Sequence, residues 1–243
     1  MKTDLLNTII RLFYLNIDGF KLKKNMEELL KLIKNLDIDS MSDKNLEDFL
    51  PELGMNDEKL SEMPHHLSDY YGKGLKFWQY PNQFSKYLKH ITNKEINSYL
   101  EIGCRWGGTF IITSEFLKLK TPNVDLFCCD LISQSDTLNE YSNHQKFEYL
   151  NISSFNLNKE ILPQNVDLIL IDGDHSYDGV KKDFEISLQF NPKYVVFHDI
   201  FSSVCPGVVN FWNEIKTNYT HFEFTEQYDS VNGNFLGIGL IEL

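Results

Sequence analysis

The stretch NSYLEIGCRWGGT, residues 97–109, decides the fold of this chain because it joins a short apolar run to a helix through a glycine-rich turn. The run 97–102 has the length and composition of a buried strand, and TFIITSEFLKLK (109–120) has those of the helix that follows. Three of the 13 glycines in the chain fall in this turn, where they permit a tight bend and a close approach to a ligand. The stretch therefore predicts a strand–turn–helix unit with a ligand at the turn.

The alternation of strand and helix continues towards the C-terminus. Further strands are predicted over 124–130, 147–151, 166–172 and 194–199, and further helices over 133–142, 153–162, 178–190 and 206–219. Short apolar runs separated by helices are typical of a parallel sheet covered on both faces. HFEFTEQY (221–228) and NFLGIGLIEL (234–243) are separated by a short stretch with Asn232-Gly233 and predict an antiparallel hairpin. The predicted fold class is α/β: a Rossmann-like, doubly wound, mostly parallel sheet with a C-terminal antiparallel hairpin.

Residues 1–75 differ in pattern from residues 76–243 and predict a helical N-terminal extension. The segment MEELLKLIKNL (26–36) places Leu29, Leu30 and Ile33 on one helical stripe, with Glu and Lys on the opposite side. Such a stripe needs a partner surface, so we expect the extension to cap the α/β domain or to form the interface of a homodimer. A lid over the substrate is the alternative interpretation.

Charge, cysteine usage and hydropathy exclude several classes of protein. A net charge of -12 argues against a nucleic-acid polymer as partner, because contacts along a polymer of phosphates need clustered Lys and Arg. The four cysteines show no C-x-x-C spacing, which argues against a zinc knuckle and a disulfide framework. No segment has the length and hydropathy of a bilayer span, and the N-terminus lacks the apolar core of a secretory signal. We therefore expect a cytoplasmic protein with no membrane partner.

Candidate ligand-binding residues follow the first three predicted strands, where doubly wound sheets bind ligands. The spacing Gly-x-x-x-Gly-Gly differs from that of dinucleotide dehydrogenases, and no Walker lysine follows. Asp130, at the end of the second strand, is placed to accept hydrogen bonds from both hydroxyls of a ribose. Ser153 and Ser154 either cap the next helix or contact an adenine. A nucleoside ligand without a diphosphate, such as S-adenosylmethionine, fits this set, and the first strand and turn contribute Glu101, Gly103, Cys104, Arg105 and Gly107.

The fourth and fifth strands bring titratable side chains to the same edge of the sheet. Asp174 and Asp178 also fit helix capping, and Asp178 is best explained in that way. Capping does not explain the whole group, because crowding so many titratable side chains is costly unless they serve a site. The predicted catalytic residues are Asp172, His175, His198 and Asp199.

The order and spacing of four motifs resemble a family of class I methyltransferases. The motifs are YLEIGCRWGGT (99–109), IDGDHSYDGVKKDF (171–184), VVFHDI (195–200) and PGVVNFWNEIK (206–216). The family groups bacterial small-molecule and sugar O-methyltransferases with cephalosporin hydroxylase-like proteins, and macrocin-type O-methyltransferases are more distant relatives. The resemblance covers residues 75–243. It implies that WQYPNQFSKYL (78–88) covers the cofactor with Gln79 as a contact, that Asp130 binds the ribose, and that Glu101, Gly103 and Gly107 line the methionine end.

The resemblance implies methyl transfer from S-adenosylmethionine to a hydroxyl of a small molecule. Family analogy favours a sugar as the acceptor, including a nucleotide-activated or capsular sugar. An NAD-dependent oxidoreductase is a rival interpretation, against which the glycine spacing argues. A non-catalytic nucleoside-binding protein is a second rival, against which the cluster of titratable residues argues.

The residues at the end of the fifth predicted strand suggest two ways of removing the proton from the acceptor hydroxyl. His198 is predicted as the general base, oriented by Asp172 or Asp199, because an imidazole titrates near neutral pH. The alternative is a divalent metal such as Mg²⁺, held by Asp172 and Asp199. Metal-dependent relatives place Glu-Asp, Asp-Asp or Asp-Asn where this chain has His198-Asp199. Because Mg²⁺ prefers oxygen ligands, this departure favours the base over the metal.

Overall fold

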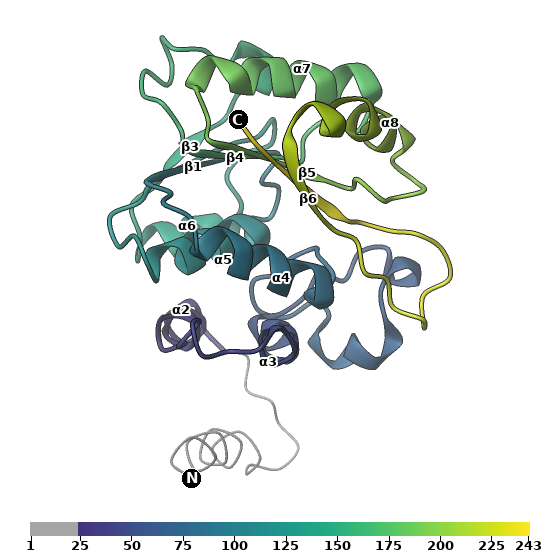
Figure 1. The fold of residues 1–243 in the computed structure, drawn as a ribbon. Helices are drawn as coiled ribbons and strands as arrows, with labels where there is room; N and C mark the ends of the chain where they lie inside the picture. The colour runs from purple at the N-terminus through teal and green to yellow at the C-terminus, as the bar shows by residue number, and fades with distance from the viewer. Residues whose placement is uncertain (1–23) are drawn as a thin grey trace.

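The computed structural model describes residues 24–243, so the expectations for residues 1–23 lie outside the described part of the chain. Its centre is a seven-stranded sheet in the order β3-β2-β1-β4-β5-β7-β6 (Figure 1). Neighbours from β3 to β5 are parallel, and β7 runs antiparallel to both of its neighbours. This arrangement confirms the predicted fold class. The strands are β1 (Ser98–Ile102), β2 (Asp125–Cys129), β3 (Glu148–Leu150), β4 (Leu168–Ile171), β5 (Tyr194–His198), β6 (Thr220–Phe224) and β7 (Ile238–Glu242).

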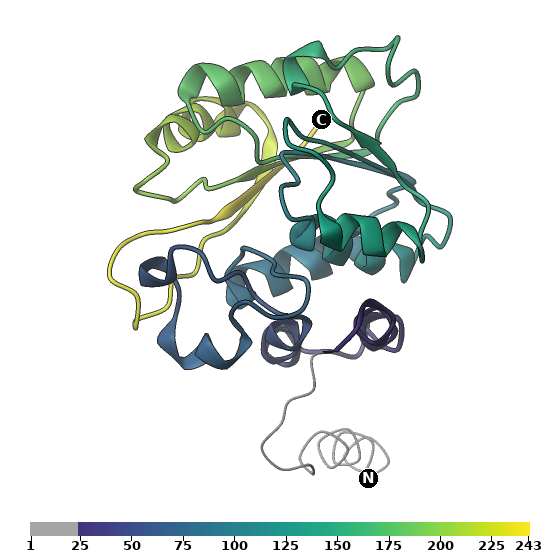
Figure 2. The ribbon, with the colours of Figure 1, turned by 180° about the vertical axis from the view of Figure 1, so that it is seen from behind.

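Helices cover both faces of the sheet, as Figures 1 and 2 show from opposite sides. One face packs against α4 (Pro81–Thr92), α5 (Gly108–Lys118) and α6 (Asp136–Ser142), and the other against α7 (Tyr177–Ser187) and α8 (Pro206–Ile215). Each face has its own hydrophobic core, because alternate side chains of the strands point to opposite sides. In the parallel register, Ile102 pairs with Cys129 and with Ile171. The carboxyl ends of β1, β2 and β4 therefore meet at one edge.

Two predictions of secondary structure are corrected. Residues 153–162 are not a helix: they contain only a 3₁₀ turn over Ser154–Asn156. The reason is local, because the side chain of Asn158 accepts hydrogen bonds from the amides of Glu160 and Ile161 and so competes with helical pairing. The terminal strands do pair antiparallel, but residues 225–237 join them as a long loop instead of a short turn.

The long loop 225–237 is held against α4 by one buried amide side chain. Gln83 donates from Nε2 to the carbonyl of Glu226 at 2.9 Å and accepts at Oε1 from the amide of Gly237 at 3.0 Å. The side chain of Gln83 is 0% exposed, and its bond to Gly237 is buried. The two ends of the loop are thereby tied to the same helix.

The described part of the N-terminal extension packs beneath α4 and α5 (Figure 1). It contains α2 (Met26–Lys34), α3 (Asp43–Phe49) and 3₁₀ turns over Leu50–Leu53, Leu60–Glu62 and His65–Tyr70. Asn25 and Glu28 form a capping box at the start of α2, which satisfies amides that a helix start leaves free. The predicted stripe is buried, with Leu29 and Ile33 in the same core as α5.

The chain shows no structural break at residue 75. Met55 forms bridges with Tyr71 and with Phe77, so the segments before and after residue 75 are paired. Gly108, the first residue of α5, lies under the carbonyl of Leu75, where an added Cβ would come within 2.4 Å of that oxygen. Within residues 24–243, no helix has the length and apolar composition needed to cross a bilayer.

Candidate active site

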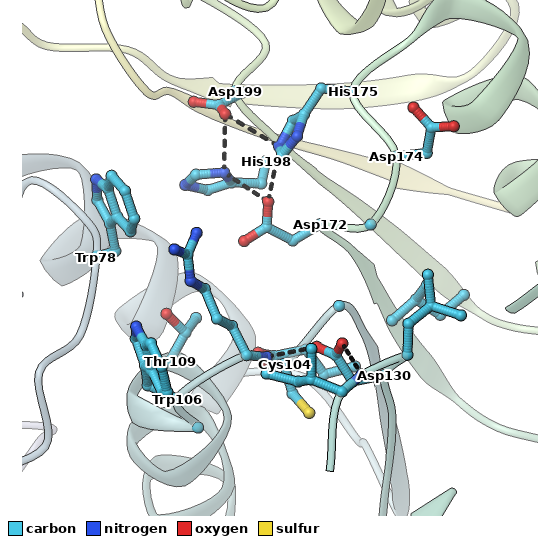
Figure 3. A pocket seen from close by; sticks show the side chains of 18 of the residues that line it. Trp78, Cys104, Trp106, Thr109, Asp130, Asp172, Asp174, His175, His198 and Asp199 are labelled. Atoms are coloured by element: carbon cyan, nitrogen blue, oxygen red, sulfur yellow. Dashed lines mark hydrogen bonds and ion pairs between the residues drawn. The ribbon is translucent and has the colours of Figure 1, made fainter. Parts of the chain in front are cut away.

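A cavity of about 860 Å³ opens at the carboxyl ends of the parallel strands (Figure 3). Its walls come from the turn after β1, the loops after β2, β3, β4 and β5, and the N-terminal extension. Of the predicted site residues, those on the wall are Glu101, Gly103, Cys104, Arg105, Gly107, Asp130, Ser153, Asp172, His175, His198 and Asp199.

Gln79 is the predicted contact that the structure does not place on the cavity wall. Its side chain is 1% exposed and buried, whereas Trp78, one residue earlier, lines the cavity. The chain bends at Gln79, and of these two neighbouring residues only Trp78 lines the cavity.

The turn after β1 needs glycine where the backbone runs close to its neighbours. Gly103 has a φ of +85°, and a Cβ there would lie 2.1 Å from the carbonyl oxygen of Asp172. Gly107 has a φ of +86° and is the N-cap of α5. Both positions demand the left-handed conformation that glycine adopts without strain. The turn thus brings β1 and the end of β4 together.

Asp130 is held by backbone amides on both sides. Its Oδ2 accepts from the amide of Arg105 at 2.7 Å, and its Oδ1 accepts from the amide of Ile132 at 3.1 Å. Asn151 donates to the carbonyls of residues 130, 131 and 132, which fixes the loop that carries this carboxylate. A carboxylate has further acceptor sites, so Asp130 can still accept from a ligand's hydroxyls.

Glu101 forms the buried floor of the cavity. It is 1% exposed, and the hydroxyl of Tyr99 donates a hydrogen bond to its Oε2. Burial raises the pKa of Glu101 to about 8, since the charged form is poorly solvated there. Below that pH the side chain is mostly neutral, which removes an unpaired charge from the interior.

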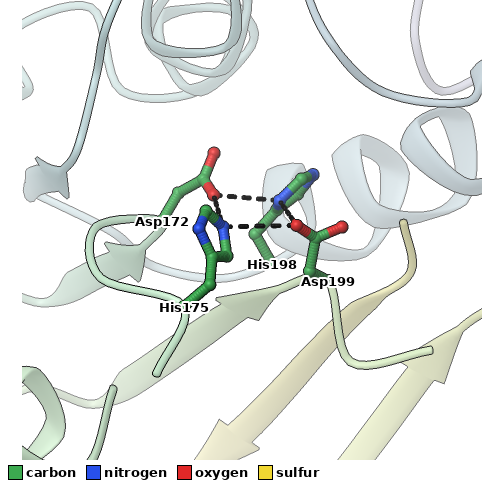
Figure 4. A group of neighbouring side chains, drawn as sticks. All are labelled: Asp172, His175, His198 and Asp199. Carbon is green, nitrogen blue, oxygen red and sulfur yellow. Dashed lines mark hydrogen bonds and ion pairs between the residues drawn. The ribbon is translucent and has the colours of Figure 1, made fainter. Parts of the chain in front are cut away.

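Four predicted catalytic residues converge on one point (Figure 4). Asp172 Oδ1 lies 2.9 Å from His198 Nδ1 and 3.2 Å from His175 Nε2. Asp199 Oδ2 lies 3.2 Å from His175 Nε2 and 3.4 Å from His198 Nδ1. Oxygen and nitrogen therefore alternate around a closed ring, and all four atoms lie within 4.8 Å of one another.

The carboxylates of this ring hold protons on the imidazoles. Hydrogen bonds to Asp172 and Asp199 raise the pKa of His175 to about 9. Burial lowers the pKa of His198, but the charges of Asp172 and Asp199 outweigh burial and raise it well above its usual value. The two carboxylates therefore favour the protonated form of both imidazoles. A protonated imidazole has no lone pair with which to accept a proton.

The N-terminal extension supplies one side of the cavity mouth. Glu58 Oε2 pairs with Arg105 Nη2 at 2.6 Å, and Glu58 Oε1 accepts from Trp106 Nε1 at 3.2 Å. The guanidinium of Arg105 stands 5.2 Å from the ring centroid of Trp78 and 5.7 Å from that of Trp106. The extension and the glycine-rich turn therefore close the same rim.

Several wall residues were not predicted from the sequence. Cys205 donates from its thiol to Asp199 Oδ2 at 3.2 Å, although nothing in its sequence context indicates this contact. The apolar rim beside Asp130 could have been found, because two large apolar residues directly follow a strand end. Leu131 is 76% exposed, and the rim consists of Leu131, Ile132 and Phe155.

Comparison with known proteins agrees with this geometry. Residues 100–200, which run from β1 through β5, match the model of a methyltransferase domain. The O-methyltransferase TomG from Streptomyces achromogenes, solved with S-adenosylmethionine, is 14% identical with a TM-score of 0.50, over 84% of this chain and 100% of TomG. A putative O-methyltransferase from Klebsiella pneumoniae is 16% identical with a TM-score of 0.48, over 88% of this chain and 95% of that protein.

An O-methyltransferase from Bacillus cereus, solved with S-adenosylhomocysteine, is 15% identical with a TM-score of 0.47, over 65% of this chain and 80% of that protein. No curated protein sequence matches the chain. The assignment of a methyltransferase domain rests on the family match over residues 100–200. The similarity to TomG agrees with it at the level of the fold. Residues 100–200 form a methyltransferase domain, and the chain around it has a Rossmann-like fold.

Proposed function

We propose that the protein transfers the methyl group of S-adenosylmethionine to a hydroxyl of a small molecule. The observation that supports the proposal is that one cavity is lined by two groups of residues. One is the turn after β1, and the other is the Asp/His ring, which consists of Asp172, His175, His198 and Asp199. In this arrangement the ribose lies at Asp130, the adenine near Ser153 and Phe155, and the methionine end over Gly103 and Glu101. The acceptor then enters beside the ring of Asp172, His175, His198 and Asp199.

The acceptor that fits this wall best is a neutral sugar. The faces of Trp78 and Trp106 offer stacking surfaces, and Trp106 is 39% exposed. Carboxylates outnumber the basic side chains of the wall, which are Lys59, Lys76, Arg105, His175 and His198. Such a wall disfavours a ligand with several negative charges. A free or glycan-linked sugar is therefore a better acceptor than a nucleotide-activated one.

The ring also fits a divalent cation. Its neighbouring ligand atoms are 2.9–3.4 Å apart. Bonds of ~2.0–2.2 Å to one central ion would give separations of this size. No described residue forms a hydrogen bond of normal geometry with either nitrogen of His198, which leaves Nδ1 available as a ligand. Two imidazoles among four ligands favour Mn²⁺, Fe²⁺, Co²⁺ or Zn²⁺ over Mg²⁺. A cation there would lower the pKa of an acceptor hydroxyl.

The chain's own residues account for the remaining chemistry. The walls align the acceptor oxygen with the methyl carbon, so that the new C–O bond forms as the C–S bond breaks and S-adenosylhomocysteine leaves. The proton of the hydroxyl passes to a group of the ring. His198 can accept that proton only after its imidazole has lost its own, and Asp172 and Asp199 then stabilise the charge that it gains.

Two measurements test this proposal. Calorimetry should detect binding of S-adenosylhomocysteine and none of NAD; the reverse result would refute the methyltransferase proposal in favour of an oxidoreductase. Mass spectrometry with labelled S-adenosylmethionine and a panel of free and nucleotide-activated sugars should then show a labelled neutral sugar. Binding of the cofactor with no transfer to any hydroxyl acceptor would favour a nucleoside-binding protein. The homodimer and the cytoplasmic location stay predictions, and sedimentation of the purified chain tests the first.

A further inference from the structure

Asp183 lies behind the cavity wall, on the side of α7 that faces the sheet. It is 0% exposed, and its Oδ1 accepts a hydrogen bond of 2.6 Å from Ser154 Oγ. Its Oδ2 is also buried, and no described residue forms a hydrogen bond of normal geometry with that oxygen. Burying a carboxylate oxygen in this way is costly, so packing alone does not explain an acid at this position.

The free oxygen of Asp183 faces the loop that carries Asp172. A Cβ added to Gly173 would lie 2.8 Å from Asp183 Oδ2, so the carboxylate stands where a side chain at residue 173 would be. The pKa of Asp183 is raised mainly by burial, and the hydroxyl of Ser154 and the amide of Asp174 offset part of that rise. Asp183 therefore contacts residues of two different loops.

These two loops form adjacent parts of the cavity wall. Ser154 lies in the loop after β3, next to Ser153 on the adenine side, and Gly173 directly follows Asp172 of the Asp/His ring. Both Ser154 and Gly173 line the cavity, whereas Asp183 stands behind them. We propose that Asp183 is a positioning residue that clamps loop 172–176 to loop 152–156, and so fixes Asp172 relative to the cofactor. The proposal rests on the proposed function for the identity of the cofactor.

The test compares four full-length variants with the wild type. Asp183→Ala removes the clamp, Asp183→Asn keeps one acceptor oxygen, and Ser154→Ala removes only the contact with the loop after β3. Glu185→Ala removes an exposed acid from the same helix and serves as the control. Binding of S-adenosylhomocysteine is measured by calorimetry, and amide hydrogen exchange is followed in peptides that cover 150–157 and 171–178.

We expect Asp183→Ala to weaken binding by about tenfold, the scale of one charge-assisted hydrogen bond. Exchange should become faster in both loops and stay unchanged elsewhere, with Asp183→Asn in between and Glu185→Ala like the wild type. Ser154→Ala should speed exchange in peptide 171–178, because Ser154 holds Asp183, which contacts that loop. A residue that merely stabilises the fold would lower the melting temperature without these local changes.

A folded Asp183→Ala with unchanged affinity and unchanged exchange would overturn the proposal. If Asp183→Ala does not fold, Asp183→Asn and Ser154→Ala test the proposal in its place. Unchanged exchange in peptide 171–178 of both variants would also overturn the proposal. A wild type that does not bind S-adenosylhomocysteine would instead refute the proposed function. The exchange data would still test the clamp in that case.

Discussion

The proposed cofactor half of the cavity, around Asp130 and the turn after β1, and the proposed acceptor half, around the Asp/His ring, are built in different ways. In the cofactor half, backbone amides hold Asp130, and glycines bring β1 close to β4. In the acceptor half, side chains hold one another, with Asp172 and Asp199 each close to both imidazoles. Backbone contacts suit the part of a ligand that takes no part in the reaction, such as a ribose. A ring of titratable side chains can instead exchange protons or bind a cation. The two halves should therefore respond differently to mutation.

Removal of the extension should have the largest effect, because it contributes to both halves. A chain of residues 76–243 would expose the core beneath α4 and α5 and lose Glu58 from the cavity rim. We expect a poorly soluble protein or one with weak cofactor binding. A chain that begins at residue 24 is the control, since it keeps every described contact. A soluble 76–243 protein with wild-type affinity for S-adenosylhomocysteine would show that the extension is dispensable.

His198→Ala should damage only the acceptor half. Turnover should fall by roughly 10²–10⁴-fold, the range for loss of a group that handles the reacting proton. Affinity for S-adenosylhomocysteine should stay as in the wild type, and the exposed His144→Ala is the matched control. Equal losses of affinity and turnover would contradict the division into halves.

A chelator separates the two possible roles of the ring. If a cation occupies it, EDTA should abolish turnover of the wild type and Mn²⁺ or Zn²⁺ should restore it. If His198 acts as a free base, activity should be complete in EDTA. Calorimetric titration of the chelated protein with Mn²⁺ gives a second readout that does not depend on the acceptor.

Asp130→Ala should damage only the cofactor half. Loss of hydrogen bonds to a charged acceptor weakens binding by about 1–3 kcal/mol, so the affinity for S-adenosylhomocysteine should fall accordingly. Binding of Mn²⁺ to the ring should not change, because Asp130 is not one of its members. Asp125→Ala, an exposed acid at the other end of β2, is the control. An unchanged affinity would mean that Asp130 does not bind the ribose.

The sequence predicted the acceptor half better than its surroundings. The strand ends fix where Asp172, His198 and Asp199 must lie, because parallel strands in register bring their carboxyl ends to one edge. The contribution of the extension was not predictable in the same way. Glu58 and Trp78 reach the cavity through turns and isolated bridges whose course depends on tertiary packing. Asp183 lies in a quoted motif, but its burial depends on how α7 sits against the sheet.

Glu101 lies where the two halves meet, and its titration should affect the stability of the fold. Its pKa is raised to about 8, by burial first and then by charges that include Asp172 and Asp130. In the unfolded chain the pKa of a glutamate is about 4.3, so between these two values the folded state binds the extra proton. The free energy of unfolding should therefore decrease as the pH rises through this window, by at most about 1.4 kcal/mol per pH unit.

Glu101→Gln tests this pH dependence, because glutamine keeps the shape of the side chain and does not titrate. The difference in unfolding free energy between the variant and the wild type should grow in favour of the variant from pH 5 to pH 8 and then level off. The exposed Glu148→Gln should show no such trend. Urea titrations at several pH values measure all three proteins. A difference that does not vary with pH would mean that Glu101 is already charged in the folded protein.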